Sequence, residues 1–188
     1  MDVRDLDRRA IEATGRIIDT LTDEQLAATT PCPQWRVRDV VAHMVDNRTQ
    51  LLTNLTGSAP EPEDDVRAGF RTATEALTAA VADDTVLTTP YKLLDVEYNA
   101  AVALFVNFAD TLVHGWDIGT AIGRDVRLPE DLVHAALKGI SRWPEDGTIW
   151  GKEGLFSEKL PVPEDASPQE KLLAITGRSP QWTPAGRS

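Results

Sequence analysis

The residues best suited to chemistry are Asp110, His114 and Asp117, which lie within one apolar stretch of the chain. Their spacing places them on one face of a helix, about one turn apart. An aspartate and an imidazole one turn apart can bind a single divalent cation, and helical bundles build metal sites from inward-facing carboxylates and histidines. The same spacing also fits a simple intrahelical hydrogen bond or ion pair, and this alternative stays open.

His43 is the next candidate ligand, because it borders an apolar stripe where a polar ring needs a partner. If His43 faces Asp110 and His114, the set becomes two imidazoles and a carboxylate. That set suits zinc first, or nickel or iron(II), and leaves positions open for water or substrate. Asp117 would be a fourth ligand or a hydrogen-bond acceptor behind an imidazole, and Asn47, one turn from His43, is a second candidate for such support.

Other polar residues near these segments have less specific signals. Cys32 precedes a helix, where a thiol can be reactive, but a small buried residue packed beneath Trp35 is the favoured interpretation. Arg36, Arg38 and Arg48 could recognise an anionic ligand, but charged side chains on a helix usually face solvent, and we expect that here.

Several reaction classes lack their motifs. The sequence contains no G-x-S-x-G, no G-x-G-x-x-G after a strand and no P-loop, which disfavours serine hydrolase, dinucleotide and nucleoside triphosphate chemistry. His134 belongs to a separate helical stretch and is interpreted as a surface residue with no ligand role. Trp116 is interpreted as core, and Gly115 as a site of close helix packing.

Helical periodicity predicts the elements that position these residues. Long helices are expected over 3–20, from Trp35 to the Gly/Pro-rich loop at 56–64, from Glu63 to about Ala82, and from about Val96 to Ile122, with a fifth over 128–142. Capping boxes at Thr22 with Gln25 and at Ser167 with Glu170 predict two short helices. Residues 82–97 are expected to be a connection, and 154–165 an extended or hairpin-like segment that holds the thin strand signal.

Four long amphipathic helices with short connections predict an all-α fold, a four-helix bundle with extra short helices and a small extended C-terminal segment. The helix at 96–122 is the most apolar and should lie deep in the core. We expect residues 1–145 to form the metal-binding bundle and residues 146–188 to form an extension packed on it.

Composition limits the partners. The chain has 188 residues and a formal net charge of -11, which disfavours nucleic acid and anionic membrane surfaces. We see no apolar stretch of membrane-spanning length, no signal-peptide pattern at the N-terminus, and a single cysteine. These features favour the cytoplasm. A homodimer is an open possibility, because the helix faces do not exclude one.

Three stretches of sequence carry a resemblance to a known family. TPCPQWRVRDVVAHMV resembles the first motif, TPCPxWxVRDLxxHxV, of a DinB-like metal-binding family whose relatives include mycothiol-dependent maleylpyruvate isomerases. FADTLVHGWDIGTAIGRDVRLPEDL resembles its second motif, and PVPEDASPQEKLLAITGRSPQW resembles the C-terminal signature of an actinobacterial subfamily. The resemblance implies a four-helix bundle with a divalent metal at one end, ligands at His43, Asp110 and His114, and mycothiol as a thiol cofactor.

The chain also departs from the isomerases. They carry glutamate where this sequence has Asp110, and a sizeable C-terminal domain where only a short tail follows residue 145. These differences argue against maleylpyruvate isomerisation itself. The function expected is a metal-dependent thiol S-transferase or isomerase acting on a small electrophile. The alternatives are a non-catalytic bundle that binds a small ligand or a protein, with a structural metal or none, and a metal-dependent hydrolase.

Overall fold

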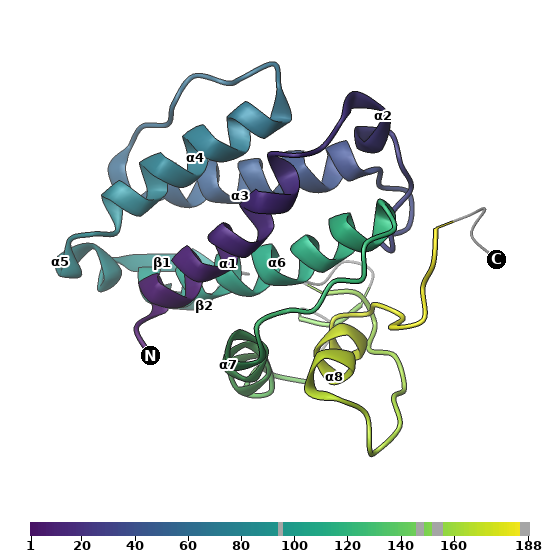
Figure 1. Cartoon of the computed structure of the whole chain (residues 1–188). Helices are drawn as coiled ribbons and strands as arrows, with labels where there is room; N and C mark the ends of the chain where they lie inside the picture. The colour runs from purple at the N-terminus through teal and green to yellow at the C-terminus, as the bar shows by residue number, and fades with distance from the viewer. Residues whose placement is uncertain (94–95, 146–148, 152–155, 185–188) are drawn as a thin grey trace.

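The structure is a computed structural model that describes residues 1–93, 96–145, 149–151 and 156–184 (Figure 1). The described residues are mostly helical, with one small two-stranded sheet, which confirms the predicted all-α, DinB-like class with extra short helices. The elements are α1 (Val3–Ile18), α2 (Asp23–Leu26), α3 (Val37–Thr56), α4 (Val66–Ala80), α5 (Asp84–Leu87), β1 (Pro90–Leu93), β2 (Val96–Asn99), α6 (Ala100–Ala121), α7 (Glu130–Ile140) and α8 (Pro168–Ile175).

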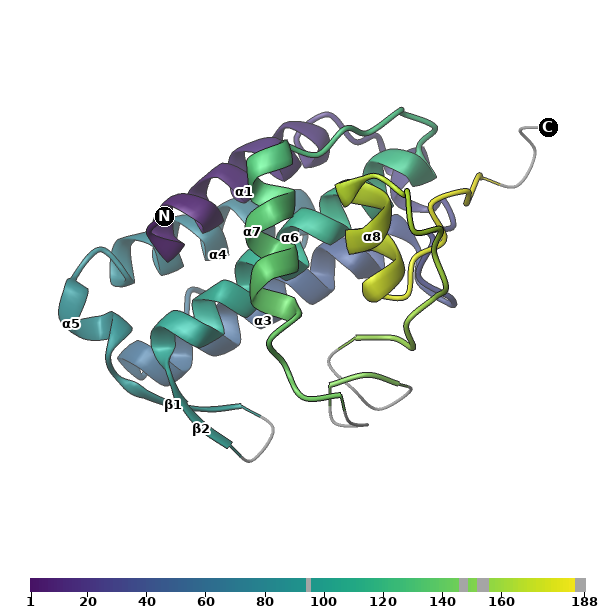
Figure 2. The same cartoon turned by 90° about the horizontal axis from the view of Figure 1, so that it is seen from below.

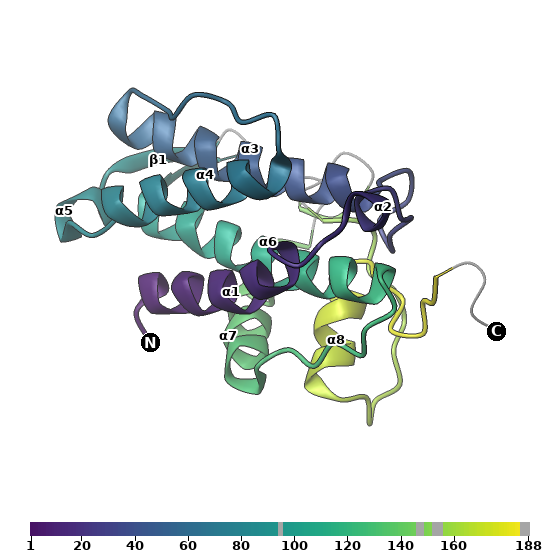
Figure 3. The same ribbon diagram turned by 45° about the horizontal axis from the view of Figure 1, so that its top comes forward.

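Helices α1, α3, α4 and α6 form the bundle. Helix α6 packs along α1 and α3, and α4 packs along α3, as Figure 3 shows. Nearly every residue of α6 between Asn107 and Gly119 is buried, as its apolar composition predicts. A helix that is buried on all sides has no room for a polar residue without a partner, so the polar residues of α6 must be paired.

A glycine sets the distance between α1 and α6. A Cβ added at Gly115 would lie 2.3 Å from the Thr14 hydroxyl oxygen, which donates a hydrogen bond to the Thr111 carbonyl at 3.0 Å. The two backbones therefore approach more closely than any larger residue would allow, as the sequence predicts for Gly115.

A buried ion pair joins three helices of the bundle. Arg48 of α3 is 0% exposed and lies 2.8 Å from both the Asp7 carboxylate of α1 and the Thr111 hydroxyl of α6. The expectation that Arg48 faces solvent is therefore wrong, because its partners come from helices distant in sequence. Arg36 and Arg38 are exposed, as expected.

Two helix starts differ from the prediction, although both predicted capping boxes are confirmed. Helix α3 begins at Val37 rather than Trp35, and α4 begins at Val66, because the Asp65 side chain accepts a hydrogen bond from the Arg67 backbone and caps the helix there.

The connection at 82–97 has more structure than predicted. It contains α5 and an antiparallel hairpin that pairs Pro90 with Asn99 and Leu93 with Val96. Helix α6 therefore begins at Ala100 rather than at Val96, and the prediction that strand signal occurs only near the C-terminus is wrong. Of the predicted extended segment, residues 154–155 lie outside the described residues, and Phe156 makes an isolated bridge with Trp150.

Helices α7 and α8 pack together on the outer side of α6 (Figure 2). Leu132 and Ile140 of α7 and Leu172 of α8 share an apolar cluster with Phe108 and Leu112 of α6. The division into units at residue 145 stays a prediction. No helix in the described parts of the chain combines the length and apolarity needed to cross a bilayer.

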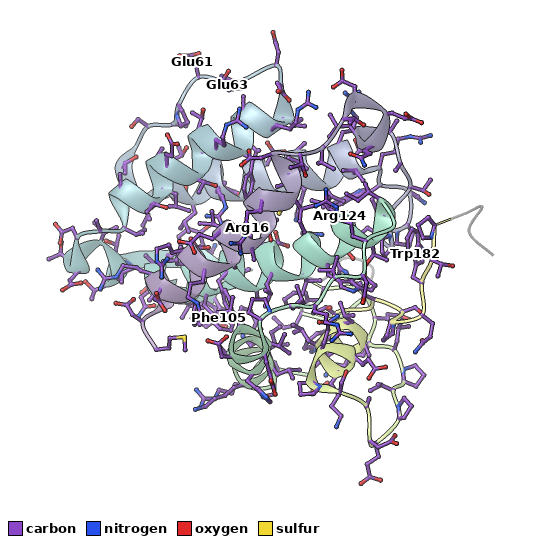
Figure 4. The ribbon with its side chains drawn as sticks, in the orientation of Figure 1. Arg16, Glu61, Glu63, Phe105, Arg124 and Trp182 are labelled. Carbon is purple, nitrogen blue, oxygen red and sulfur yellow. The ribbon has the colours of Figure 1, made fainter. Side chains whose placement is uncertain are left out.

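The segment after α8 returns to the end of α6. Trp182 packs against the cluster that contains Ile118 and Ala121, and it shares a hollow with Arg124 (Figure 4). Residues between α8 and Trp182 are therefore held close to α6.

Candidate metal centre

The structure brings His43, Asp110 and His114 together. His43 lies on α3, and the other two lie one turn apart on α6, where these helices pack against each other. The Nε2 atoms of both histidines point at one carboxylate oxygen: His43 Nε2 lies 3.4 Å and His114 Nε2 lies 3.2 Å from Asp110 Oδ1.

These separations fit the ligands of one metal ion. Metal–ligand bonds of about 2.0–2.1 Å in a tetrahedral zinc site put neighbouring ligand atoms about 3.3 Å apart. The two distances to Asp110 Oδ1, 3.2 and 3.4 Å, bracket that value and lie at or beyond the long end of ordinary hydrogen bonds. Three protein donors of these types are also what open, catalytic zinc sites use.

Asp117 and Asn47, the residues predicted to support the ligands, make three close contacts with them. His114 Nδ1 lies 2.8 Å from Asp117 Oδ2, and Asp117 is 0% exposed. Asn47 Nδ2 lies 2.9 Å from His43 Nε2 and donates to Asp110 Oδ2 at 3.3 Å. The contact with Asp117 leaves His114 Nε2 directed at Asp110, and the contact of Asn47 with Oδ2 leaves Oδ1 directed at the histidines.

Carboxylates and imidazoles face each other in the site and shift each other's pKa values. Burial disfavours the charged form of Asp110, but the imidazoles of His114 and His43 outweigh it and hold the pKa of Asp110 well below its usual range. Burial likewise opposes the charged form of His114, yet Asp110 and Asp117 raise the pKa of His114 well above its ordinary value. Two carboxylates thus favour positive charge at this point of the fold, whether it comes from a proton or from a cation.

Arg178 was not identified from the sequence. It follows α8, is 9% exposed, and its Nη2 lies 3.0 Å from Asp117 Oδ2. Burial raises the pKa of Asp117, but Arg178 and His114 outweigh burial, so the pKa of Asp117 is lowered. The only hint in the sequence was that Arg178 lies in the C-terminal stretch GRSPQW. That stretch has no residue spacing typical of metal ligands.

Cys32 lies at the same site. It is half-buried, and its thiol lies 3.3 Å from Asp117 Oδ2 and 3.2 Å from Arg178 Nη2. The interpretation as a residue that merely packs beneath Trp35 is therefore incomplete. The Trp35 ring lies close to both histidines, with its centroid 4.8 Å from that of His43 and 6.0 Å from that of His114.

Cys32 creates a second possible set of ligands. The donor atoms of Cys32, His114 and Asp117 lie within 4.8 Å of one another, as do those of His43, Asp110 and His114. The two sets share His114 through its opposite ring nitrogens. The Arg178 guanidinium contacts all three residues of this second set, including His114 Nδ1 at 3.5 Å, and its positive charge disfavours a cation there.

A cavity of 420 Å³ opens onto the histidines. Trp35, Val113 and Phe156 line it with apolar surface, and Ser157 adds a hydroxyl. A larger hollow of 710 Å³ lies between α1, α6 and α7, but none of the predicted ligands lines it, so the chemistry of the donors, rather than size, identifies the candidate site.

The residues expected to play no part in the site are found away from it. His134 is exposed on α7, with its Nε2 3.6 Å from Glu130. Trp116 is buried in α6, as a core residue should be.

The N-terminal part of the chain is similar to a known protein family. Residues 8–68 match the model of the mycothiol maleylpyruvate isomerase N-terminal domain. The match supports a DinB-like, mycothiol isomerase-like family for this part of the chain. The match includes His43 and Asn47 and ends before α6, so it is the packing of α6 against α3 that joins Asp110 and His114 to it.

Two relatives extend over most of the chain. They are the "Uncharacterized protein Rv0738" of Mycobacterium tuberculosis (strain ATCC 25618 / H37Rv) and the "Uncharacterized protein MT0763" of strain CDC 1551 / Oshkosh. Each is 26% identical over 177 residues, which is 92% of this chain and 95% of the relative. No solved structure matches the chain.

Proposed function

We propose that His43, Asp110 and His114 bind one divalent cation, with zinc as the first choice and nickel or iron(II) as the alternatives. The observation that carries the proposal is the convergence of two Nε2 atoms on Asp110 Oδ1, at 3.4 and 3.2 Å. Imidazoles backed by hydrogen bonds to carboxylates are the arrangement that holds zinc ligands in position in other proteins. The contact between His114 Nδ1 and Asp117, 2.8 Å long, fits that arrangement.

The protein is proposed to be a thiol-dependent S-transferase or isomerase that acts on a small electrophile. The family match supports mycothiol as the class of thiol, because residues 8–68 resemble the domain of a mycothiol-dependent isomerase. When bound, the cation would stabilise the thiolate of the cofactor and so lower the pKa of its thiol.

The residues around the ligands have separate tasks in this proposal. Asp110 and the two histidines supply the donors, and Asn47 holds the second oxygen of Asp110 at 3.3 Å. Trp35, Val113 and Phe156 offer apolar surface to the electrophile.

The metal is tested by elemental analysis of protein purified without a metal-affinity tag. We expect one divalent ion per chain in the natural protein and loss of that ion in His43→Ala. The matched control is His134→Ala, which removes an exposed histidine far from the site and should keep the ion. Stoichiometric metal in His43→Ala would remove His43 from the site.

The reaction is tested by the consumption of mycothiol in the presence of a panel of small electrophiles. We expect turnover that depends on the metal and is lost in His43→Ala. Bound metal without turnover across the panel would favour a binding protein, and cleavage of ester or amide substrates without thiol would favour a hydrolase.

A further inference from the structure

Asp117 is a fully buried carboxylate behind the proposed metal ligands. It is 0% exposed, and its Oδ2 lies 2.8 Å from His114 Nδ1. An ionised carboxylate in the interior is costly unless a positive charge and hydrogen bonds compensate it. A carboxylate that orients a ligand imidazole must also be held in position itself.

Arg178 supplies both the charge and the hydrogen bonds. Its Nη2 lies 3.0 Å from Asp117 Oδ2, and its Nε lies 3.4 Å from Asp117 Oδ1. The rest of the guanidinium is also engaged: Nη1 donates to the Thr176 carbonyl at 2.6 Å, and Nη2 contacts the Cys32 sulfur at 3.2 Å. Because protein atoms already occupy these donors and the residue is 9% exposed, Arg178 is poorly placed to bind a substrate anion.

The backbone after α8 fixes where Arg178 lies. Gly177 has a φ of 79°, the left-handed conformation that commonly follows the last residue of a helix. Its N–H donates to the Ala174 carbonyl at 3.1 Å, and the Arg178 N–H donates to the Leu173 carbonyl at 2.8 Å. This pair of bonds is the Schellman motif. The arginine therefore starts from a backbone position that the end of α8 determines.

We propose that Arg178 is a positioning residue of the metal centre. It fixes Asp117, Asp117 fixes the His114 ring with Nε2 toward the metal, and the segment after α8 thereby completes a site whose ligands come from α3 and α6. This inference rests on the proposed function, because it assigns Arg178 a task only if His43, Asp110 and His114 bind an ion.

The test measures zinc affinity by competition with a chromophoric chelator. Arg178→Ala should bind zinc about 10–100-fold more weakly than the natural protein, the usual effect of removing a group that supports a metal ligand. Millimolar guanidinium should restore affinity to this variant by occupying the vacated position. Urea, which has a similar shape and no charge, should not.

Matched variants separate positioning from general stability. Arg178→Lys keeps the charge but cannot reach Asp117, Cys32 and Thr176 together, and we expect an intermediate loss of affinity. Arg48→Lys makes the same change at a second buried arginine, which contacts Asp7 and Thr111 rather than the proposed ligands or Asp117, and it should leave zinc affinity unchanged. Circular dichroism checks that each variant is folded. If Arg178→Ala does not fold, the comparison of the two lysine variants gives the result.

A double-mutant cycle tests the order of the contacts. Asp117→Asn should weaken zinc binding to a similar extent, and adding Arg178→Ala to it should cause little further loss, because both changes break one chain of contacts. Independent, additive losses would contradict the proposed order. Unchanged affinity in folded Arg178→Ala would overturn the inference and leave the metal site intact. Absence of His43-dependent zinc binding in the natural protein would overturn the proposed function and this inference with it.

Discussion

The close approach of α1 and α6 at Gly115 gives a prediction whose size follows from the structure. In Gly115→Ala the new Cβ would lie 2.3 Å from the Thr14 hydroxyl oxygen and 3.2 Å from the Thr14 Cβ. Thr14 is 2% exposed, so its side chain has little free space to move into. Either the helices separate or the hydroxyl turns away from the Thr111 carbonyl, which it contacts at 3.0 Å.

Three terms set the expected change in the free energy of unfolding. Overpacking of a dense core costs about 1–3 kcal/mol. Loss of the hydrogen bond to Thr111 costs about 1 kcal/mol. Alanine is a better helix former than glycine by about 1 kcal/mol, which offsets the hydrogen bond. We therefore expect Gly115→Ala to be less stable than the natural protein by about 1–3 kcal/mol.

Urea unfolding followed by circular dichroism measures this difference, with Thr14 variants as internal controls. Adding Thr14→Ala to Gly115→Ala removes the overlapping oxygen and should recover much of the loss that overpacking caused. Adding Thr14→Ser keeps that oxygen and should recover little. A Gly115→Ala protein as stable as the natural one, or equal behaviour of the two double variants, would refute the idea that the Thr14 hydroxyl and Gly115 set the distance between α1 and α6.

Three further predictions address the site and the fold. By elemental analysis, Cys32→Ala should retain one metal ion per chain, whereas His43→Ala should lose it. Loss of the ion in Cys32→Ala with retention in His43→Ala would instead place the ion between Cys32, His114 and Asp117. Asp7→Ala should destabilise the protein by about 3–5 kcal/mol in urea unfolding, because it leaves the fully buried Arg48 without its counter-charge; a loss below about 1 kcal/mol would contradict this. The backbone N–H of Arg67 holds the pKa of Asp65 below its ordinary value, so the stability that Asp65 adds is present above the unfolded pKa and lost as pH falls through the folded one. Asp65→Ala should accordingly be less stable than the natural protein by about 1 kcal/mol at pH 7. Unfolding curves at lower pH should show a smaller difference in the free energy of unfolding between the two proteins. A difference that does not change with pH would rule out an ionised Asp65 as the cap.

Predictions from the sequence agree best with the structure where all the residues of a pattern belong to one helix. The capping boxes at Thr22 and Ser167 depend on residues three apart, and both are present. The one-turn spacing of Asp110 and His114 depends only on α6 being a helix, and their side chains lie 3.2 Å apart. The hairpin at β1 and β2 was missed because Pro90 and the polar residues around it break the helical period, while strand pairing depends on two segments together.

The sequence by itself determined which stretches form the long helices, which face of each is apolar, and that a carboxylate and an imidazole share one face of α6. Helical spacing is a property of the chain over a few residues, so these conclusions need no knowledge of the rest of the molecule. Tertiary structure alone decided that His43 meets Asp110, that Arg48 is buried against Asp7, and that Arg178 lies behind Asp117. Each of these contacts joins segments far apart in the chain, and which faces meet is decided by how all the helices share one core.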